Sequence, residues 1–439
     1  MEMNVVILGA GESGVGAALL AKKKGYPVFV SDKGPIKEAY KIELKENNIA
    51  FEEGQHSLES IYKAAVVIKS PGIPDYIDLI RDLKAKGIAV ISEIEFAAKH
   101  TDSVTIGITG SNGKTTTTNL TYHLLRTAGL DVGIGGNVGQ SFARLVASQK
   151  RDYYVLELSS FQLDGIVDYR PDIAILLNIS PDHLDRYEYK MENYIRSKFR
   201  ITLNQQPGDL FIYNEENAYM QDYLNQHPPT ARTMSVGAPN YDGQYLTINS
   251  MLRFDLSHSS LYGPHNRFNA HCAILAARQL GANREAIQQG LDSFANAPHR
   301  MEEITTIKGV SYINDSKATN VDAVYYALLS MEQPIIWVAG GQDKGNDYEP
   351  IKALVAEKVR AIVCLGLDNS TLLETFGPLV STIVETRSCP AAVEAASQLA
   401  QPGEVVLLSP ACASFDLFEN FARRGELFKE AVLAFKASL

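Results

Sequence analysis

The sequence has little of what marks a secreted, zinc-stabilised or membrane-spanning protein. Its 439 residues include four cysteines, which lie far apart and form no CxxC pair. Neither a disulfide scaffold nor a structural zinc site is therefore indicated. No long apolar run occurs, and the first residues lack the basic and apolar parts of a signal segment. We expect no membrane insertion and a location in the reducing cytoplasm.

Basic residues are also in short supply. Acidic residues exceed basic ones by 51 − 41 = 10, and the one basic run, Lys22 to Lys24, is typical of a solvated helix face. A nucleic-acid partner is therefore not expected. The hydrophobic share of 45% and the charged share of 21% are those of a folded globular protein.

Short apolar runs alternate with amphipathic stretches throughout, which predicts βαβ units and parallel sheets in an α/β fold. At roughly 150 residues per domain, the length indicates about three domains. Breaks in the pattern near 93–103 and 295–303 place a Rossmann-like domain at 1–94 and a P-loop ATPase-like domain with a parallel or mixed sheet at 95–297. A second Rossmann-like domain is placed at 298–439.

The first glycine-rich turn lies in "VVILGAGESGVGAALL". Gly9, Gly11 and Gly14 have GxGxxG spacing between a strand and a helix, and Asp32 ends the next strand. This pattern predicts a nucleotide whose pyrophosphate faces the turn, with Asp32 near a ribose or base, and NAD is the default ligand. A tight turn without a ligand is the alternative.

The second glycine-rich turn, "TGSNGKTT", departs from the usual phosphate-loop spacing, because Ile108 stands where a glycine is expected. The essential groups remain. Gly110 and Gly113 allow close backbone approach, Lys114 can reach the β- and γ-phosphates, and Thr115 can bind Mg²⁺. ATP or GTP binding is predicted over a fortuitous helix cap, through Gly110, Ser111, Asn112, Gly113, Lys114, Thr115 and Thr116.

Two further strand ends carry candidate metal ligands. Glu157 ends the apolar run "YYVLE", where a buried carboxylate would be costly unless paired or bound to a cation. "LLNISPDHLDRY" places Asp182, His183 and Asp185 after another strand. A histidine in a loop is equally consistent with an ordinary surface residue.

Seven motifs in order resemble those of the Mur ligases over nearly the whole chain: "TGSNGKTT", "ELSSFQL", "NISPDHLDRY", "GPHNRFN", "APHRME", "NDSKATN" and "LLSPACASFDLFENFARRGELF". Within that family, the motif order and the N-terminal GxGxxG domain are most similar to the members that add D-glutamate. The resemblance implies ATP-dependent amide formation on UDP-N-acetylmuramoyl-L-alanine, through an acyl phosphate, with ADP and phosphate as products in peptidoglycan precursor synthesis.

The same resemblance implies roles residue by residue. A UDP-sugar, in place of NAD, would lie near Ser13, Asp32, Ser70 and Gly72, and its muramoyl part near Asn137, Ser159 and Gln162. ATP would contact Asn266, Asn269, Arg300 and Asp315. Two Mg²⁺ ions would involve Thr115, Glu157, His183 and Lys198, the last as a carbamate formed with CO₂. Lys114, Glu157, His183 and Lys198 form the implied catalytic set. D-Glutamate would meet Lys317, Thr319, Lys344, Ser414 and Phe421.

Several alternatives remain open at this point. Without the resemblance, Lys198 is an unremarkable helix lysine, and Asn266 and Asn269 are typical of a helix N-cap. The family position matched to Lys344 could instead correspond to a residue one place away. For the whole chain, the rivals are a Mur ligase that adds another amino acid, an NAD-dependent oxidoreductase with a regulatory P-loop, and a nucleotide-dependent binding module. The expected form is a monomer with small-molecule substrates.

Overall fold

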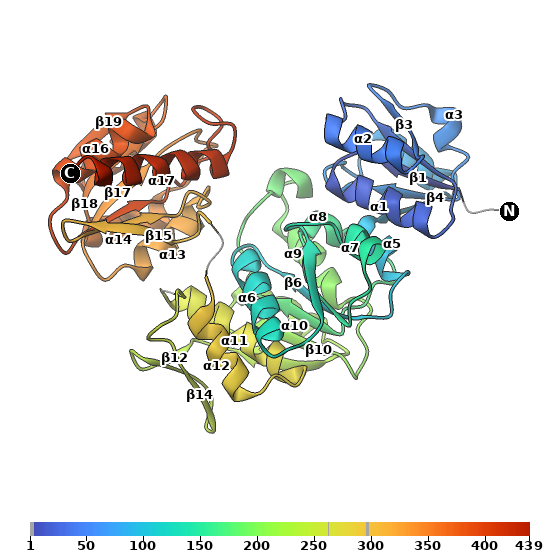
Figure 1. Cartoon of the computed structure of the whole chain (residues 1–439), viewed down its shortest axis with the longest axis horizontal. Helices are drawn as coiled ribbons and strands as arrows, with labels where there is room; N and C mark the ends of the chain where they lie inside the picture. Colours follow the sequence, from blue (N-terminus) through green and yellow to red (C-terminus); the bar gives the residue numbers. More distant parts are fainter. Residues whose placement is uncertain (1–3, 262, 296–297) are drawn as a thin grey trace. The chain divides into compact units, whose positions relative to one another are not determined.

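The computed structural model describes residues 4–261, 263–295 and 298–439 (Figure 1). These divide into two compact units, one formed by 1–258 with 268–293 and the other by 259–267 with 294–439. The first unit contains two large parallel sheets and the second contains one large mixed sheet. The α/β class expected from the sequence is confirmed.

The N-terminal sheet has the order β3-β2-β1-β4-β5, and all its strands are parallel. β1 is buried on both faces, as a parallel strand covered by helices must be. The strands are β1 (Val5–Leu8), β2 (Val28–Asp32), β3 (Ala50–Glu53), β4 (Val66–Lys69) and β5 (Ala89–Ser92). The helices are α1 (Glu12–Lys23), α2 (Glu38–Glu46), α3 (Leu58–Ile61), α4 (Asp78–Ala85) and α5 (Glu93–Ala98).

The central sheet has the order β11-β10-β9-β6-β8-β7 and is wholly parallel. Its strands are β6 (Val104–Thr109), β7 (Val132–Gly136), β8 (Tyr153–Glu157), β9 (Ile173–Leu176), β10 (Leu210–Asn214) and β11 (Arg232–Val236). Its helices are α6 (Lys114–Thr127), α7 (Phe142–Ser148), α8 (Ser160–Leu163), α9 (Met191–Phe199), α10 (Ala218–Gln226), α11 (Gly263–Gln279) and α12 (Arg284–Ser293), with short 3₁₀ turns η1 (Leu184–Tyr187) and η2 (Arg200–Thr202). β6 is central, so the turn that follows it lies between two neighbouring strand ends.

A small antiparallel sheet follows the central one in the chain. It consists of β12 (Asn240–Tyr241), β13 (Tyr245–Asn249) and β14 (Leu252–Asp255). This sheet was not predicted from the sequence. Among the described residues, no helix is both long and apolar enough to cross a bilayer.

The C-terminal sheet has the order β15-β16-β20-β17-β18-β19, and only the β15–β16 pair is antiparallel. Its strands are β15 (Glu302–Ile307), β16 (Val310–Asn314), β17 (Ile335–Ala339), β18 (Val359–Leu365), β19 (Ile383–Thr386) and β20 (Val405–Leu408). Its helices are α13 (Val321–Ser330), α14 (Lys352–Lys358), α15 (Ser370–Phe376), α16 (Cys389–Leu399) and α17 (Phe421–Ala437), with the 3₁₀ turn η3 (Glu349–Ile351).

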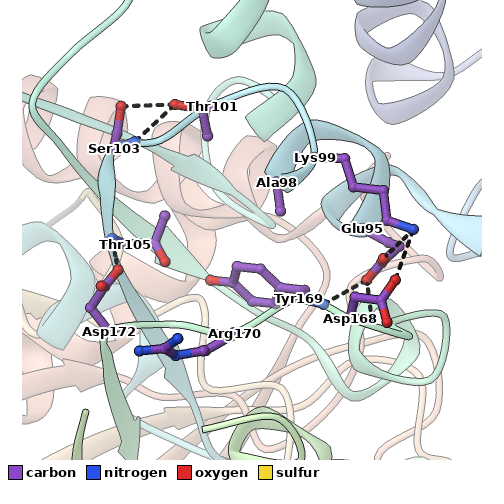
Figure 2. Close-up of a pocket in the computed structure, with 10 residues that line it drawn as sticks. All are labelled: Glu95, Ala98, Lys99, Thr101, Ser103, Thr105, Asp168, Tyr169, Arg170 and Asp172. Atoms are coloured by element: carbon purple, nitrogen blue, oxygen red, sulfur yellow. Dashed lines mark hydrogen bonds and ion pairs between the residues drawn. The ribbon is translucent and has the colours of Figure 1, made fainter. Parts of the chain in front are cut away.

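The helix that joins the first two sheets is bound to the central one. In α5 the carboxylate of Glu95, which is fully buried, accepts backbone hydrogen bonds from Val167, Asp168 and Tyr169 at 2.9, 3.0 and 2.8 Å (Figure 2). The expected boundary at 94/95 thus falls inside α5. The expected boundary at 297/298 falls at residues 296–297, which lie outside the described residues.

Candidate active site

The turn after β6 is shaped by two glycines. Gly110 has φ +153° and Gly113 has φ +82°, both in the region that favours glycine. A side chain on Gly113 would lie 2.6 Å from Asn269 Oδ1, and one on Gly110 would lie 3.1 Å from Leu177 Cβ. Ile108 is fully buried within β6, before the loop begins. The missing glycine therefore lies in the strand, and the loop itself keeps both glycines it needs.

The turn is held by the loop that follows β9. Asn112 N donates to Asn178 Oδ1 at 2.8 Å, and Asn178 Nδ2 donates back to Asn112 O at 3.1 Å. The Ser111 hydroxyl donates to Ser180 O at 2.9 Å and lies 3.0 Å from the Tyr194 hydroxyl. Neither Asn178 nor Tyr194 was predicted from the sequence as part of the site. Asn178 belongs to a quoted motif, but its partner lies 66 residues away.

Two lysines converge on one carbonyl oxygen of the turn. Lys114 Nζ donates to Gly110 O and Ser111 O, both at 2.8 Å, and Lys198 Nζ also donates to Gly110 O at 2.8 Å. Lys198 is 2% exposed. Burial, and next the charge of Lys114, lower the pKa of Lys198 well below its usual range. The turn thus concentrates amine groups where a polyphosphate would need them.

Glu157 supplies a buried carboxylate at the end of β8. It is 3% exposed, and its Oε1 accepts a hydrogen bond from Asn137 Nδ2 at 2.9 Å. Its Oε2 is buried and has no hydrogen-bond partner among the described residues. Because an orphaned carboxylate oxygen is costly in the interior and is a favoured ligand of hard cations, the site fits Mg²⁺. Thr115, buried in the first turn of α6, is the second candidate ligand.

His183 lies in a different environment. It has φ +51° and a side chain that is 54% exposed, with Nε2 3.6 Å from Asp182 Oδ2. Its ring lies 5.1 Å from that of Phe161. Within the described ranges it makes no hydrogen bond to Glu157 or Lys198. His183 is thus far more exposed than Glu157 and Lys198, which are 3% and 2% exposed.

The first glycine-rich turn is occupied by carboxylates. Asp32 Oδ2 accepts from Ala10 N at 2.6 Å, and Oδ1 accepts from Gly34 N at 2.8 Å. Glu12, at the start of α1, accepts from Arg144 Nε of α7 at 2.7 Å. A side chain at Gly14 would lie 1.8 Å from Gly9 O, so this glycine allows the helix to pack against the turn.

The remaining residues implied for the UDP-sugar lie in loops that follow strands or at the beginnings of helices. Ser70 Oγ donates to Gly9 O at 3.3 Å, and Gly72 O accepts from Arg186 at 3.2 Å. Ser13 lies half-buried in the first turn of α1. Ser159 and Gln162 form a capping box at α8, in which Ser159 N donates to Gln162 Oε1 at 3.0 Å. The capping box accounts for these two side chains without a ligand.

The two asparagines implied for adenine lie within α11. The helix begins at Gly263, so neither Asn266 nor Asn269 is its N-cap, and that alternative is wrong. Asn266 is 4% exposed and Asn269 is 3% exposed. Asn269 lies against Gly113, which places its amide at the phosphate loop.

In the second unit, Asp315 lies at the end of β16. It accepts from Met301 N at 3.2 Å and from the Ser409 hydroxyl at 3.1 Å. Burial raises its pKa to about 7, against the opposing charge of Arg300. Arg300 is therefore close enough to Asp315 for its charge to act on the carboxylate.

The residues implied for the amino acid lie in the loops at the same edge of this sheet. Lys317 Nζ lies 5.4 Å from the ring centre of Phe421. Ser414 is 2% exposed, whereas Thr319 and Lys344 are exposed. A pocket of about 230 Å³ lies beside them, lined among others by Gln342, Asp343 and Asp416.

Another pocket of about 230 Å³ lies in the first unit, at the amino end of β6 (Figure 2). Thr105 and Asp172 line it, and Thr105 N donates to Asp172 Oδ2 at 2.8 Å. The phosphate loop follows the carboxyl end of the same strand. Ligands of open α/β sheets bind at carboxyl ends, so this pocket is not the predicted nucleotide site.

Comparison with known protein families assigns each part of the chain. Residues 108–277 match the Mur ligase middle domain, and residues 299–412 match the Mur ligase, glutamate ligase domain. Residues 4–78 match the MurD N-terminal domain. The chain belongs to the Mur ligase family. This membership confirms the resemblance found in the sequence motifs and the three-part architecture that it implies.

Similar Mur ligases span the whole chain. A protein of Christiangramia forsetii is 51% identical over 98% of this chain and 99% of its own, and one of Porphyromonas gingivalis is 50% identical over 99% of each. Both are named UDP-N-acetylmuramoylalanine--D-glutamate ligase. Among solved structures, UDP-N-acetylmuramate-alanine ligase MurC of Thermotoga maritima shares the fold with a TM-score of 0.62 and 18% identity, over 99% and 100% of the two chains. MurF ligase of T. maritima, solved in complex with ADP, has a TM-score of 0.61 and 16% identity, over 93% of this chain and 95% of its own.

Proposed function

We propose that this Mur ligase joins D-glutamate to UDP-N-acetylmuramoyl-L-alanine, with conversion of ATP to ADP and phosphate, in peptidoglycan precursor synthesis. The observation that carries the proposal is the convergence of Lys114 and Lys198 on Gly110 O, in the same unit as the orphaned oxygen of Glu157. The names of relatives about half identical over nearly their whole length support the choice of substrates. The ADP-bound MurF structure supports the choice of nucleotide.

The chemistry begins with a carboxylate that is too poor an electrophile to react with an amine. Its oxygen attacks the γ-phosphorus of ATP, the bond to the β-phosphate oxygen breaks, and ADP leaves with the electron pair. Lys114 offsets the charge that builds on the transferring group. The amine of D-glutamate then adds to the acyl carbon and loses a proton, and phosphate leaves as the amide forms. Water must be excluded meanwhile, because acyl phosphates hydrolyse.

Mg²⁺ would be held by Thr115 and Glu157, and a second ion by His183 and a carbamate on Lys198; these ions would neutralise phosphate charge. The carbamate would form by attack of the neutral Lys198 amine on CO₂, with release of a proton. Lys198 is buried and forms no ion pair among the described residues, and both observations support a neutral amine. Metal titration of His183→Ala tests the role proposed for this half-exposed histidine.

The remaining contacts follow the family pattern. UDP-N-acetylmuramoyl-L-alanine would bind at Ser13, Asp32, Ser70, Gly72, Asn137, Ser159 and Gln162. Asn266, Asn269, Arg300 and Asp315 would bind ATP, and Lys317, Thr319, Lys344, Ser414 and Phe421 would bind D-glutamate. Since one chain carries every motif, we also propose that it acts as a monomer. We propose a cytoplasmic location, where ATP and the UDP-sugar are available. Light scattering of the purified protein tests the monomer.

Phosphate release tests the function most directly. Purified protein with ATP, Mg²⁺ and UDP-N-acetylmuramoyl-L-alanine receives D-glutamate, L-alanine, L-lysine or meso-diaminopimelate in turn. We expect phosphate release with D-glutamate alone. Release with another of these amino acids would contradict D-glutamate as the specific substrate. Tight, saturable NADH binding without phosphate release would instead favour the oxidoreductase.

A further inference from the structure

Arg424 is a buried arginine near the start of α17, and the proposed function gives it no role. It is 0% exposed. Its guanidinium donates four hydrogen bonds, all to neutral oxygens: Nε to Ser316 Oγ at 3.0 Å, Nη2 to Ser316 O at 2.9 Å, and Nη1 to Cys412 O at 3.2 Å and Gly340 O at 3.4 Å. No carboxylate forms an ion pair with it in the described part of the chain. A buried cation without a carboxylate partner is costly to remove from water.

The acceptors lie in three loops that follow three different strands. Ser316 follows β16, Gly340 follows β17 and Cys412 follows β20. Each loop carries a residue proposed to bind the amino acid, within four positions of the contact with Arg424. These residues are Lys317 beside Ser316, Lys344 after Gly340, and Ser414 after Cys412.

The start of α17 is joined to the same network. The Ser316 hydroxyl accepts from Arg424 Nε and donates to Phe421 O at 2.8 Å. Lys317 Nζ lies 5.4 Å from the Phe421 ring centre. Phe421, another proposed contact for the amino acid, is therefore fixed relative to Lys317 through Ser316.

Two glycines leave this network no room to adjust. Gly341 has φ +129°, and a side chain on it would lie 2.2 Å from Ala413 O and 3.2 Å from Arg424 Nη1. A side chain on Gly425 would lie 2.3 Å from His299 Nδ1. The loops thus cross at backbone distance, and the helix that carries Arg424 packs directly on His299.

We infer that Arg424 is a positioning residue, which sets the spacing of the loops that receive the two carboxylates and the amine of the incoming amino acid. This inference rests on the proposed function. The planar guanidinium reaches three backbone segments at once, whereas an ammonium group on a flexible stem cannot hold the same fork. A displacement near 1 Å in such a site costs as much as 10²-fold in rate.

The test compares Arg424→Lys with Arg423→Lys in the phosphate-release assay. Arg423 is the adjacent arginine, and its side chain is 45% exposed with Glu426 3.3 Å away, so its replacement should leave all constants unchanged. For Arg424→Lys we expect the KM for D-glutamate to rise at least about 10-fold, while the KM values for ATP and the UDP-sugar stay at those of the wild type. Thermal unfolding and circular dichroism of each variant report the folded fraction.

A purely structural role predicts a different result. Loss of kcat in proportion to the folded fraction, with an unchanged KM for D-glutamate, would overturn the inference. If Arg424→Lys does not fold, Ser316→Ala decides, because it deletes the hydroxyl that accepts from the guanidinium and donates to Phe421 O, and it should raise the KM for D-glutamate about 5-fold. An unchanged constant in Ser316→Ala would overturn the inference as well. Absence of D-glutamate-dependent phosphate release in the wild-type protein would instead refute the proposed function.

Discussion

The two glycine-rich turns of the first unit both connect a strand to a helix, but they differ in the charge of the side chains around them. Both follow the first strand of a parallel sheet and open a helix. The turn after β1 is lined by Asp32 and Glu12, and Asp32 already accepts the Ala10 amide. The turn after β6 is lined by Lys114 and Lys198. Glycines thus determine how closely a ligand approaches, whereas the surrounding charges determine which part of it, hydroxyls or phosphates, is bound.

The largest expected effect comes from removing the cation of the second turn. Lys114→Ala should lower kcat by about 10³-fold or more, because the charge on the transferring phosphoryl group loses its nearest partner. ADP formation measures the effect. Lys150→Ala, which alters an exposed lysine of the same domain, is the matched control. ADP formation at the wild-type rate in Lys114→Ala would remove the distinction between the two turns.

Replacement of the carboxylate near the second turn should have a smaller effect. Glu157→Gln keeps the hydrogen bond from Asn137 but removes the charge on the oxygen that lacks a partner. We expect kcat to fall about 10²-fold and the Mg²⁺ concentration for half-maximal activity to rise. Kinetics across a magnesium titration measure both quantities, and an unchanged magnesium dependence would exclude Glu157 as a ligand.

The first turn should affect binding of one substrate only. Asp32→Asn should raise the KM for the UDP-sugar about 10-fold, since one charged acceptor for ribose or base is lost, and leave the KM for ATP unchanged. Initial rates with each substrate varied in turn test this. An equal rise in the KM for the UDP-sugar and the KM for ATP would mean that the two turns do not act on separate ligands.

These predictions rest on residues that were visible in the sequence to different degrees. Gly110, Gly113 and Lys114 could be identified because a turn is local and its demands on backbone and charge fall on neighbouring residues. Arg424 could not, because its partner Ser316 lies 108 residues away. Lys198 was found only through family resemblance, since its burial depends on β6 and the turn folding over α9. The antiparallel strands β12 to β14 are short and half-exposed, and they gave no clear periodic signal.

The smallest expected effect concerns the attachment of the first domain. Glu93 in α5 is 2% exposed and accepts from Ala143 N of α7, and burial raises its pKa to about 8. A pKa raised in the folded state stabilises the protein below the unfolded value, and this stability is lost as pH rises through the folded value. The free energy of unfolding should therefore fall between about pH 4.5 and 8, by at most about 1.4 kcal/mol per pH unit from this group.

Glu93→Gln should flatten that part of the profile. Chemical denaturation at a series of pH values measures it, and Glu46→Gln, at an exposed glutamate of the same domain, should retain the wild-type slope. Equal slopes in the wild type and Glu93→Gln would show that this carboxyl is ionised in the folded protein.

The backbone hydrogen bonds from residues 167–169 to the Glu95 carboxylate determine where the chain can be divided into fragments. A fragment that ends at residue 94 would keep Glu93 but lose the carboxylate that holds the 167–169 backbone. A fragment that starts at residue 95 would lack the Glu93 contact to α7. An isolated N-terminal domain should therefore end at Ser92, and α5 should be expressed with the central domain.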